Sequence, residues 1–127
     1  MIDLHTLARQ TKYPPQAFAF VQRGLDHAIK RIHGEPDPEV DLMSRHISGG
    51  QLCCGLREYA IERYGLMALS VLNSWQIRSC EDFGHIVFAM VDSGLLHKTE
   101  NDSIEDFRNL FEFDAAFSPS LELTENN

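Results

Sequence analysis

The residues best suited to binding a ligand lie together around the expected start of a helix. Arg45 and His46 can supply positive charge, and Ser48, Gly49 and Gly50 follow them. The first N–H groups of a helix have no partner within it, so they can bind an anion, and glycines let the backbone come close to a ligand. We therefore predict a ligand- or anion-binding site at these five residues. The alternative is that the glycines only open the helix and His46 only hydrogen-bonds the loop.

A second group of interest consists of acidic residues. Asp102, Glu105 and Asp106 lie close together, and Glu100 precedes them. Paired carboxylates can act as acid and base when apolar surroundings raise the pKa of one of them. These four residues fall in and after an expected turn, where such surroundings are lacking. We predict that they form a solvated interaction face for a protein partner.

The triplet Asp82-Phe83-Gly84 matches the magnesium-binding triplet of protein kinases. That triplet works with a glycine-rich loop, a strand lysine and an H-R-D loop, and this sequence of 127 residues contains none of them. Asp82 is better explained as the cap of a helix and Phe83 as a core residue. We identify no catalytic set, and therefore favour a protein that is not an enzyme.

Histidines and cysteines are present without the spacing of a metal site. No two of the six histidines are four residues apart, and the three cysteines include no C-x-x-C pair. Cys53 and Cys54 are adjacent, so on a helix their side chains point about 100° apart and cannot easily join. We expect the cysteines to be small, partly buried fillers, and we predict neither a metal nor a cofactor.

The net charge of −8 is concentrated at one end of the chain. Residues 100–127 contain eight acidic residues and one basic residue, whereas residues 1–99 contain eleven acidic and ten basic residues. An acidic surface repels nucleic acids and anionic membranes, and it suits a basic protein partner.

The composition is that of an ordinary globular protein. Hydrophobic residues make up 43% of the chain and charged residues 24%, and its length suits a single domain. No stretch approaches the roughly 20 apolar residues that span a bilayer, and the first residues lack a signal-peptide core. We expect a cytoplasmic protein with one domain over residues 1–117, including a linker at 35–47, and a flexible acidic tail at 118–127.

Apolar residues repeat at helical spacing along most of the chain. Helices are predicted over residues 1–10, 15–33, 48–64, 66–72 and 79–94. Residues 75–77 are expected to form an extended bridge, and the segment 66–72 is expected to be well buried. The predicted core consists of Phe18, Val21, Leu25, Leu52, Leu56, Leu69, Leu72, Trp75, Phe83, Ile86, Val87 and Met90.

The last part of the predicted domain contains a β-hairpin and a helical turn. Strands are expected at 95–99 and 104–113 around a turn rich in Asn, Asp and Ser, and a helical turn follows at 114–117. The fold class is therefore mainly α (α+β): a helical domain with a small C-terminal hairpin.

Three helices followed by a hairpin give residues 48–113 a topology like that of a winged helix. The recognition helix would then be 79–94, which has three acidic residues and no Lys or Arg. This charge argues against a winged helix that binds nucleic acid.

Several stretches together resemble a family of short bacterial cytoplasmic proteins of unknown function. They read RHISGGQLCCGLREYAIERYG, MALSVLNSWQI and EDFGHIVFAMVDSGLLHKTENDSIEDF with FEFDAAF after it, and YPPQAFAFVQRGLDHA precedes them. The resemblance covers about residues 12 to 117. It implies a domain that stands alone, and it implies no activity. Gly50 departs from the family pattern, in which a larger polar residue such as Gln is expected.

The residues favour a non-enzymatic protein-interaction module with an acidic C-terminal face, whose partner is a basic protein or a second copy of the chain. One alternative is a small-ligand or anion-binding protein that uses the helix start at residues 45–50. The least favoured alternative is a nucleic-acid-binding winged helix.

Overall fold

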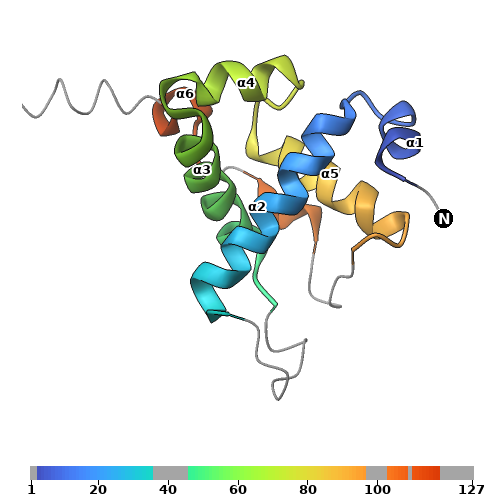
Figure 1. The fold of residues 1–127 in the computed structure, drawn as a ribbon, viewed down its shortest axis with the longest axis horizontal. Helices are drawn as coiled ribbons and strands as arrows, with labels where there is room; N and C mark the ends of the chain where they lie inside the picture. Colours follow the sequence, from blue (N-terminus) through green and yellow to red (C-terminus); the bar gives the residue numbers. More distant parts are fainter. Residues whose placement is uncertain (1–2, 36–45, 97–102, 109, 118–127) are drawn as a thin grey trace, which may run out of the picture.

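The computed structural model describes residues 3–35, 46–96, 103–108 and 110–117. The long helices are α2 (Pro15–His33), α3 (Gly49–Tyr64) and α5 (Cys80–Asp92), and α2 packs most extensively against α3. Shorter helices are α1 (Leu4–Arg9), α4 (Ala68–Ser74) and α6 (Phe113–Ala116), with 3-10 turns η2 (Gly65–Met67) and η3 (Ile104–Phe107). Figure 1 shows α2 crossing in front of α5, with α3 beside it and α4 above.

Local sequence signals explain where the long helices begin and end. Pro15 occupies the first turn of α2, where its missing N–H costs nothing, and Gly34 ends the helix with a φ of 80°. Ser48 and Gln51 form a capping box at the start of α3, and Gly65 ends that helix with a φ of 54°. The predicted long helices are therefore present, with ends within two residues of those expected.

The predicted β-hairpin is wrong. Residues 104–107 form η3 and residues 113–116 form α6, and the described residues contain no strand; positions 97–99 of the first predicted strand lie outside the described part. Ser103 explains the difference, because its hydroxyl accepts the N–H of Glu105 and its own N–H donates to Asp106. This local capping turns the chain into a 3-10 helix rather than a strand. Without the hairpin, the winged-helix topology predicted for residues 48–113 is wrong as well.

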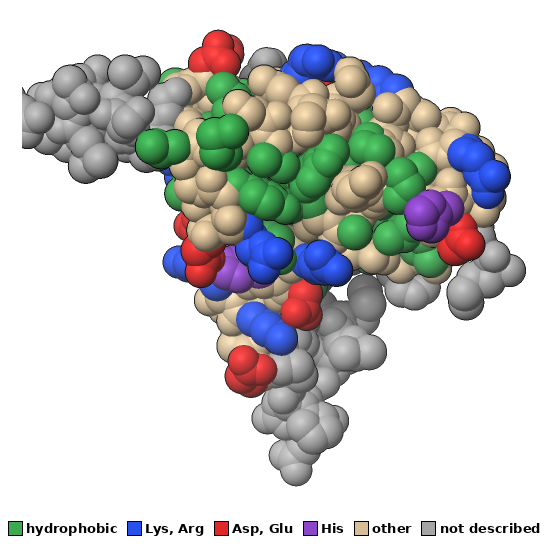
Figure 2. Space-filling model, turned by 45° about the horizontal axis from the view of Figure 1, so that its top comes forward, with side chains coloured by type: hydrophobic (Ala, Val, Ile, Leu, Met, Phe, Trp, Pro, Cys, Tyr) green, Lys and Arg blue, Asp and Glu red, His purple; other side chains and the backbone are tan. Residues whose placement is uncertain are grey.

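The segment that follows α3 is more exposed than predicted. Leu66 is 69% exposed and Met67 is 60% exposed, although residues 66–72 were expected to be well buried. Ala68 and Leu72 of α4 are buried. The chain therefore contributes side chains to the core only after η2. Residues 75–77 are also not extended, because Trp75 and Gln76 form a turn. Figure 2 turns the top of Figure 1 toward the viewer and shows hydrophobic side chains gathered on this face.

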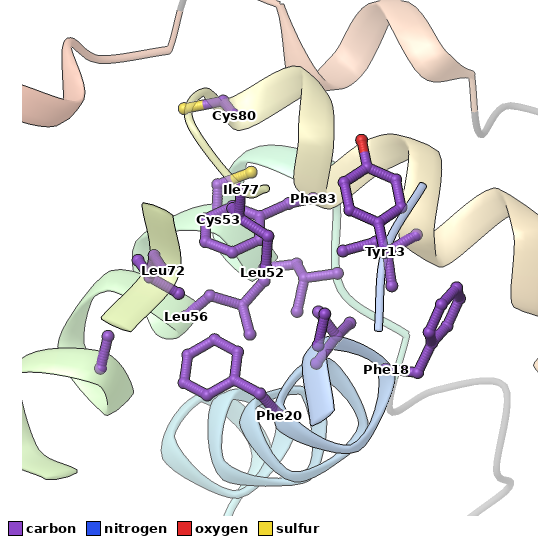
Figure 3. Close-up of a cluster of buried hydrophobic side chains, with 14 of the residues drawn as sticks. Tyr13, Phe18, Phe20, Leu52, Cys53, Leu56, Leu72, Ile77, Cys80 and Phe83 are labelled. Carbon is purple, nitrogen blue, oxygen red and sulfur yellow. The ribbon is translucent and has the colours of Figure 1, made fainter. Parts of the chain in front are cut away.

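The core lies where α2, α3 and α5 meet. Phe18 and Val21 of α2, Leu56 of α3 and Phe83 and Ile86 of α5 are completely buried. Figure 3 shows this cluster, including Phe20 and Ile77, which the apolar pattern did not identify. Leu25, Leu69, Trp75 and Val87, predicted as core, are partly buried against it. Further rings come from the C-terminal segment, where three phenylalanines are buried: Phe107, Phe113 and Phe117.

Candidate functional site

The predicted site around the start of α3 is partly described. Arg45 lies outside the described residues. His46 and Ser48 are exposed, Gly49 is buried and Gly50 is partly buried. The Nε2–H of His33, at the end of α2, donates to the carbonyl of His46 at 3.0 Å. This hydrogen bond ties the residues before α3 to the end of α2.

The first turn of α3 is held by its capping box. The Ser48 hydroxyl accepts the N–H of Gln51 at 3.1 Å, and the N–H of Ser48 donates to Gln51 Oε1 at 2.9 Å. The first intrahelical bond runs from the N–H of Leu52 to the carbonyl of Ser48 at 2.9 Å. The N–H groups of Gly49 and Gly50 come before that bond and point out of the helix end.

A cavity of about 130 Å³ opens beside this helix start. Its walls come from α2, α3, α5 and η3, elements that are far apart in the sequence. The apolar wall consists of Leu25, Ile29, Ile47, Leu52, Val87, Phe88, Val91, Leu96 and Phe107. The cavity therefore has the composition of a small-molecule site, apolar with a few polar groups.

The polar groups of the cavity are those that the sequence singled out in two separate places. His46, Ser48 and Gly49 line it from the start of α3, and Asp106 lines it from η3. A Cβ atom on Gly49 would lie 2.8 Å from the Cβ of Asp106 and 3.1 Å from the ring of Phe107. Glycine is thus required here for η3 to approach α3, and this approach brings the predicted ligand site and part of the predicted acidic face together.

The carboxylate of Asp106 changes the electrostatics of the predicted anion site. Asp106 accepts the N–H of Ser103 at 3.0 Å through Oδ2, and it lies against the first residue of α3. A negative charge near the positive end of a helix dipole is stabilised there. The negative charge of Asp106, which lines the cavity, would also repel an external anion, and this favours a neutral ligand at this cavity over an anionic one.

The predicted acidic face is only partly described. Glu100 and Asp102 lie outside the described residues, whereas Glu105 and Asp106 are exposed. Glu105 forms an ion pair with Arg108 at 3.2 Å. Part of the negative charge of η3 is therefore balanced locally.

A buried charge that the sequence did not identify as a site lies at the start of α5. Asp82 is 7% exposed, and it is the one charged side chain that is buried in the described parts of the chain. Its Oδ1 accepts the Tyr13 hydroxyl at 2.5 Å, and its Oδ2 accepts the N–H groups of Arg78 at 2.8 Å and Ser79 at 3.2 Å. Lys12 adds an ion pair at 3.4 Å. The capping role predicted for Asp82 is correct, but the tyrosine partner could not be foreseen from local spacing.

The surroundings of Asp82 and Tyr13 fix the protonation state of both groups at neutral pH. Burial alone would raise the pKa of Asp82, but the hydrogen bonds from Tyr13 and Arg78 and the charge of Lys12 hold that pKa below its usual value. Burial and the bond to Asp82 raise the pKa of Tyr13 far above its usual value. The carboxylate stays ionised and the phenol stays protonated, so the pair joins the α1–α2 connection to α5 rather than transferring protons.

Two further findings concern membrane-spanning helices and similarity to known proteins. No helix in residues 3–35, 46–96, 103–108 and 110–117 combines the length and apolar character needed to cross a membrane. No protein-family model, curated protein or solved structure matches this chain.

Proposed function

We propose that this protein binds a small, compact and largely apolar molecule in the cavity beside the start of α3, without transforming it. The observation that carries the proposal is the cavity itself, which is walled by nine apolar residues and has polar groups at one end. Such a pocket is the usual starting point for a binding-site hypothesis. We also propose that the protein is cytoplasmic, as predicted from the sequence.

The volume limits the size of the ligand. An apolar cavity of roughly 150 Å³ in another protein holds benzene or xenon, and the cavity here is similar at about 130 Å³. The ligand is therefore about the size of a single ring or a short branched alkyl group. A hydrogen-bond donor on the ligand would face the carboxylate of Asp106, and an acceptor would face the N–H groups at the start of α3.

Filling the cavity should weaken binding. Val91→Phe replaces a small side chain of the cavity wall with a larger ring that occupies part of the cavity. We expect the affinity for a probe such as benzyl alcohol to fall at least tenfold. For a probe of this size a Kd on the order of 0.1–1 mM is expected from the binding energy available per atom. Ligand-observed NMR titration of the full chain measures the affinity.

The control places the same side chain elsewhere. Val71→Phe lies on α4, and Val71 does not line the cavity. This variant should bind the probe as the wild type does, provided that both variants show the melting transition of a folded protein. Equal binding by wild type and Val91→Phe would place the ligand elsewhere, and absence of binding by a panel of single-ring probes would contradict the proposal.

A second candidate function, association with a second copy of the chain, is favoured by the exposed side chains after α3. We define the apolar face as Leu66 and Met67 with the adjoining Tyr64 and Trp75, whose rings pack edge to face with centroids 6.1 Å apart. Hydrophobic side chains are visible together on this side in Figure 2. Exposed apolar patches of this kind commonly mark protein contacts, and a two-fold pair would bury both copies of the face.

Charge on the apolar face should prevent this association. We expect sedimentation velocity to show a dimer that grows with protein concentration and is lost when Leu66 and Met67 are both replaced by lysine. Ile32→Lys, at an apolar residue 44% exposed near the end of α2, should leave the dimer intact. A wild-type protein that stays monomeric at every concentration would rule this candidate out.

A further inference from the structure

The polar end of the cavity beside the start of α3 carries a full negative charge. Asp106 lines the cavity there together with His46, Ser48 and Gly49, and among the described residues no lysine or arginine lines it. A helix start carries about half a positive charge, whereas a carboxylate carries a whole negative one. The charge of Asp106 therefore outweighs that of the helix, and this end of the cavity attracts a cation.

Within the described parts of the chain, no basic side chain forms an ion pair with Asp106. Arg108, the base that follows η3, pairs instead with Glu105 at 3.2 Å and with Glu81 at 3.9 Å. Asp106 accepts the N–H of Ser103 at 3.0 Å through Oδ2. A carboxylate has two oxygens and about four lone pairs, so it can accept a further donor from a ligand.

Aromatic rings lie at the same end of the cavity as this carboxylate. Phe88 of α5 and Phe107 of η3 both line the cavity, and their rings meet edge to face with centroids 6.2 Å apart and planes at 87°. A Cβ atom on Gly49 would lie 2.8 Å from the Cβ of Asp106 and 3.1 Å from the ring of Phe107. The face of an aromatic ring attracts a cation within about 6 Å of its centroid. Negative charge and aromatic rings therefore converge at the start of α3.

Close packing fixes η3 in this position. A Cβ atom on Gly84 of α5 would lie 2.8 Å from the Cγ of Phe107, so η3 is held at one glycine of α5 and, through Gly49, at one glycine of α3. The capping box with Ser103 sets the position of the Asp106 side chain. Groups that are already in place lose less freedom when a ligand binds.

We propose that the cavity takes a small organic cation, an ammonium group on a single ring or a short alkyl chain, with the ammonium at Asp106 and the apolar part inside. This inference rests on the proposed function, because it names the class of ligand for the same site. The ammonium donates to the carboxylate and lies near the ring of Phe107, and the apolar part contacts the wall formed by α2, α3 and α5. The net charge of −8 adds a weaker attraction at longer range.

The test compares two probes of nearly equal size, benzylamine, which is an ammonium ion near neutral pH, and benzyl alcohol, which is uncharged. Ligand-observed NMR titrations of the full chain are run at roughly pH 8, where an ordinary histidine is neutral. We expect benzylamine to bind about fivefold more tightly, a typical gain for an ion pair near the surface with a ring beside it. Added salt should weaken the binding of benzylamine and leave that of the alcohol unchanged.

Two variants of neighbouring residues on η3 locate the charge. Asp106→Asn keeps the shape of the side chain, and it should reduce the ratio of the two affinities to less than about twofold. Glu105→Gln removes the same charge one position away, and Glu105 does not line the cavity. The ratio should therefore stay at about fivefold in this variant.

The outcomes separate this inference from the proposed function. If the wild-type protein binds benzyl alcohol as tightly as benzylamine, the cation preference is overturned while the cavity remains a binding site, and this result does not depend on whether a variant folds. A preference that survives in Asp106→Asn would also overturn the inference. Absence of binding by both probes would contradict the proposed function itself.

Discussion

Replacing Asp82 with alanine is expected to lower the free energy of unfolding by about 3 kcal/mol, because it removes the acceptor for several buried donors at once. The Tyr13 hydroxyl and the N–H groups of Arg78 and Ser79 all donate to this carboxylate. Without it, donors enclosed between the α1–α2 connection and α5 lose their partners. Chemical denaturation followed by circular dichroism measures the change.

Two further variants define how the loss arises. Tyr13→Phe removes one of the donors and keeps the ring in the core, so it should cost about 1.5 kcal/mol. Asp92→Ala removes an exposed carboxylate at the other end of the same helix, and its effect should stay within about 0.5 kcal/mol. An Asp82→Ala protein that is as stable as Asp92→Ala would show that the buried hydrogen bonds contribute little.

The stabilisation by Asp82 should also depend on pH. The pKa of Asp82 in the folded protein lies below its usual value, and that of the unfolded chain is about 3.9. The contribution is therefore complete above the unfolded pKa and is lost as the pH falls through the folded pKa. Between pH 7 and pH 3 the stability difference between wild type and Asp82→Asn should shrink, and a difference that grows on acidification would contradict this assignment.

Gly55→Ala should destabilise the protein by about 2 kcal/mol, although alanine is the better helix former by about 1 kcal/mol. A Cβ atom at position 55 would collide with the Cβ of Ala28 and lie 3.3 Å from its Cα. Neither atom belongs to a flexible side chain that could turn away, so α2 and α3 would have to move apart. Their contact is the most extensive between helices in the described structure, and the strain would spread into the core.

Gly50 on the same helix is the matched control. The nearest atoms to an added Cβ there are Ser48 Oγ at 3.9 Å and Leu110 Cδ2 at 4.0 Å, so there is room for a methyl group. Gly50→Ala should therefore stabilise the protein by about 0.5–1 kcal/mol through helix propensity. Thermal and chemical denaturation of both variants show whether each alanine raises or lowers the free energy of unfolding. Stabilisation by both alanines would mean that α2 and α3 do not pack as closely as described.

The long helices could be predicted because their signals are local. Pro15, Gly34, Ser48 with Gln51, and Gly65 fix helix ends through contacts within a few residues. The hairpin prediction failed where two local readings competed. Residues 103–106 read S-I-E-D, which fits a capping box as well as a turn, and the capping box formed. The S-I-E-D motif is therefore the local sequence signal for η3.

The candidate site was predictable in its parts but not in its arrangement. The residues His46, Ser48 and Gly49 were identified as a helix start that could bind a ligand, and Asp106 was assigned to a separate acidic face. Their meeting depends on η3 packing against α3 and α5, which no spacing along the chain reveals. The contact Tyr13–Asp82 was missed for the same reason, since its partners are 69 positions apart.

The most direct test of the proposed binding function is a methyl NMR titration of the full chain with benzyl alcohol. The cavity is unusually suited to it, because its wall carries methyl groups from five different segments, including Leu25, Ile47, Leu52, Val91 and Leu96. We expect saturable shifts in these methyls with a common Kd, and unchanged signals from Leu66 on the apolar face. Shifts centred on Leu66, or no saturable shift in the methyls of the cavity, would contradict the account.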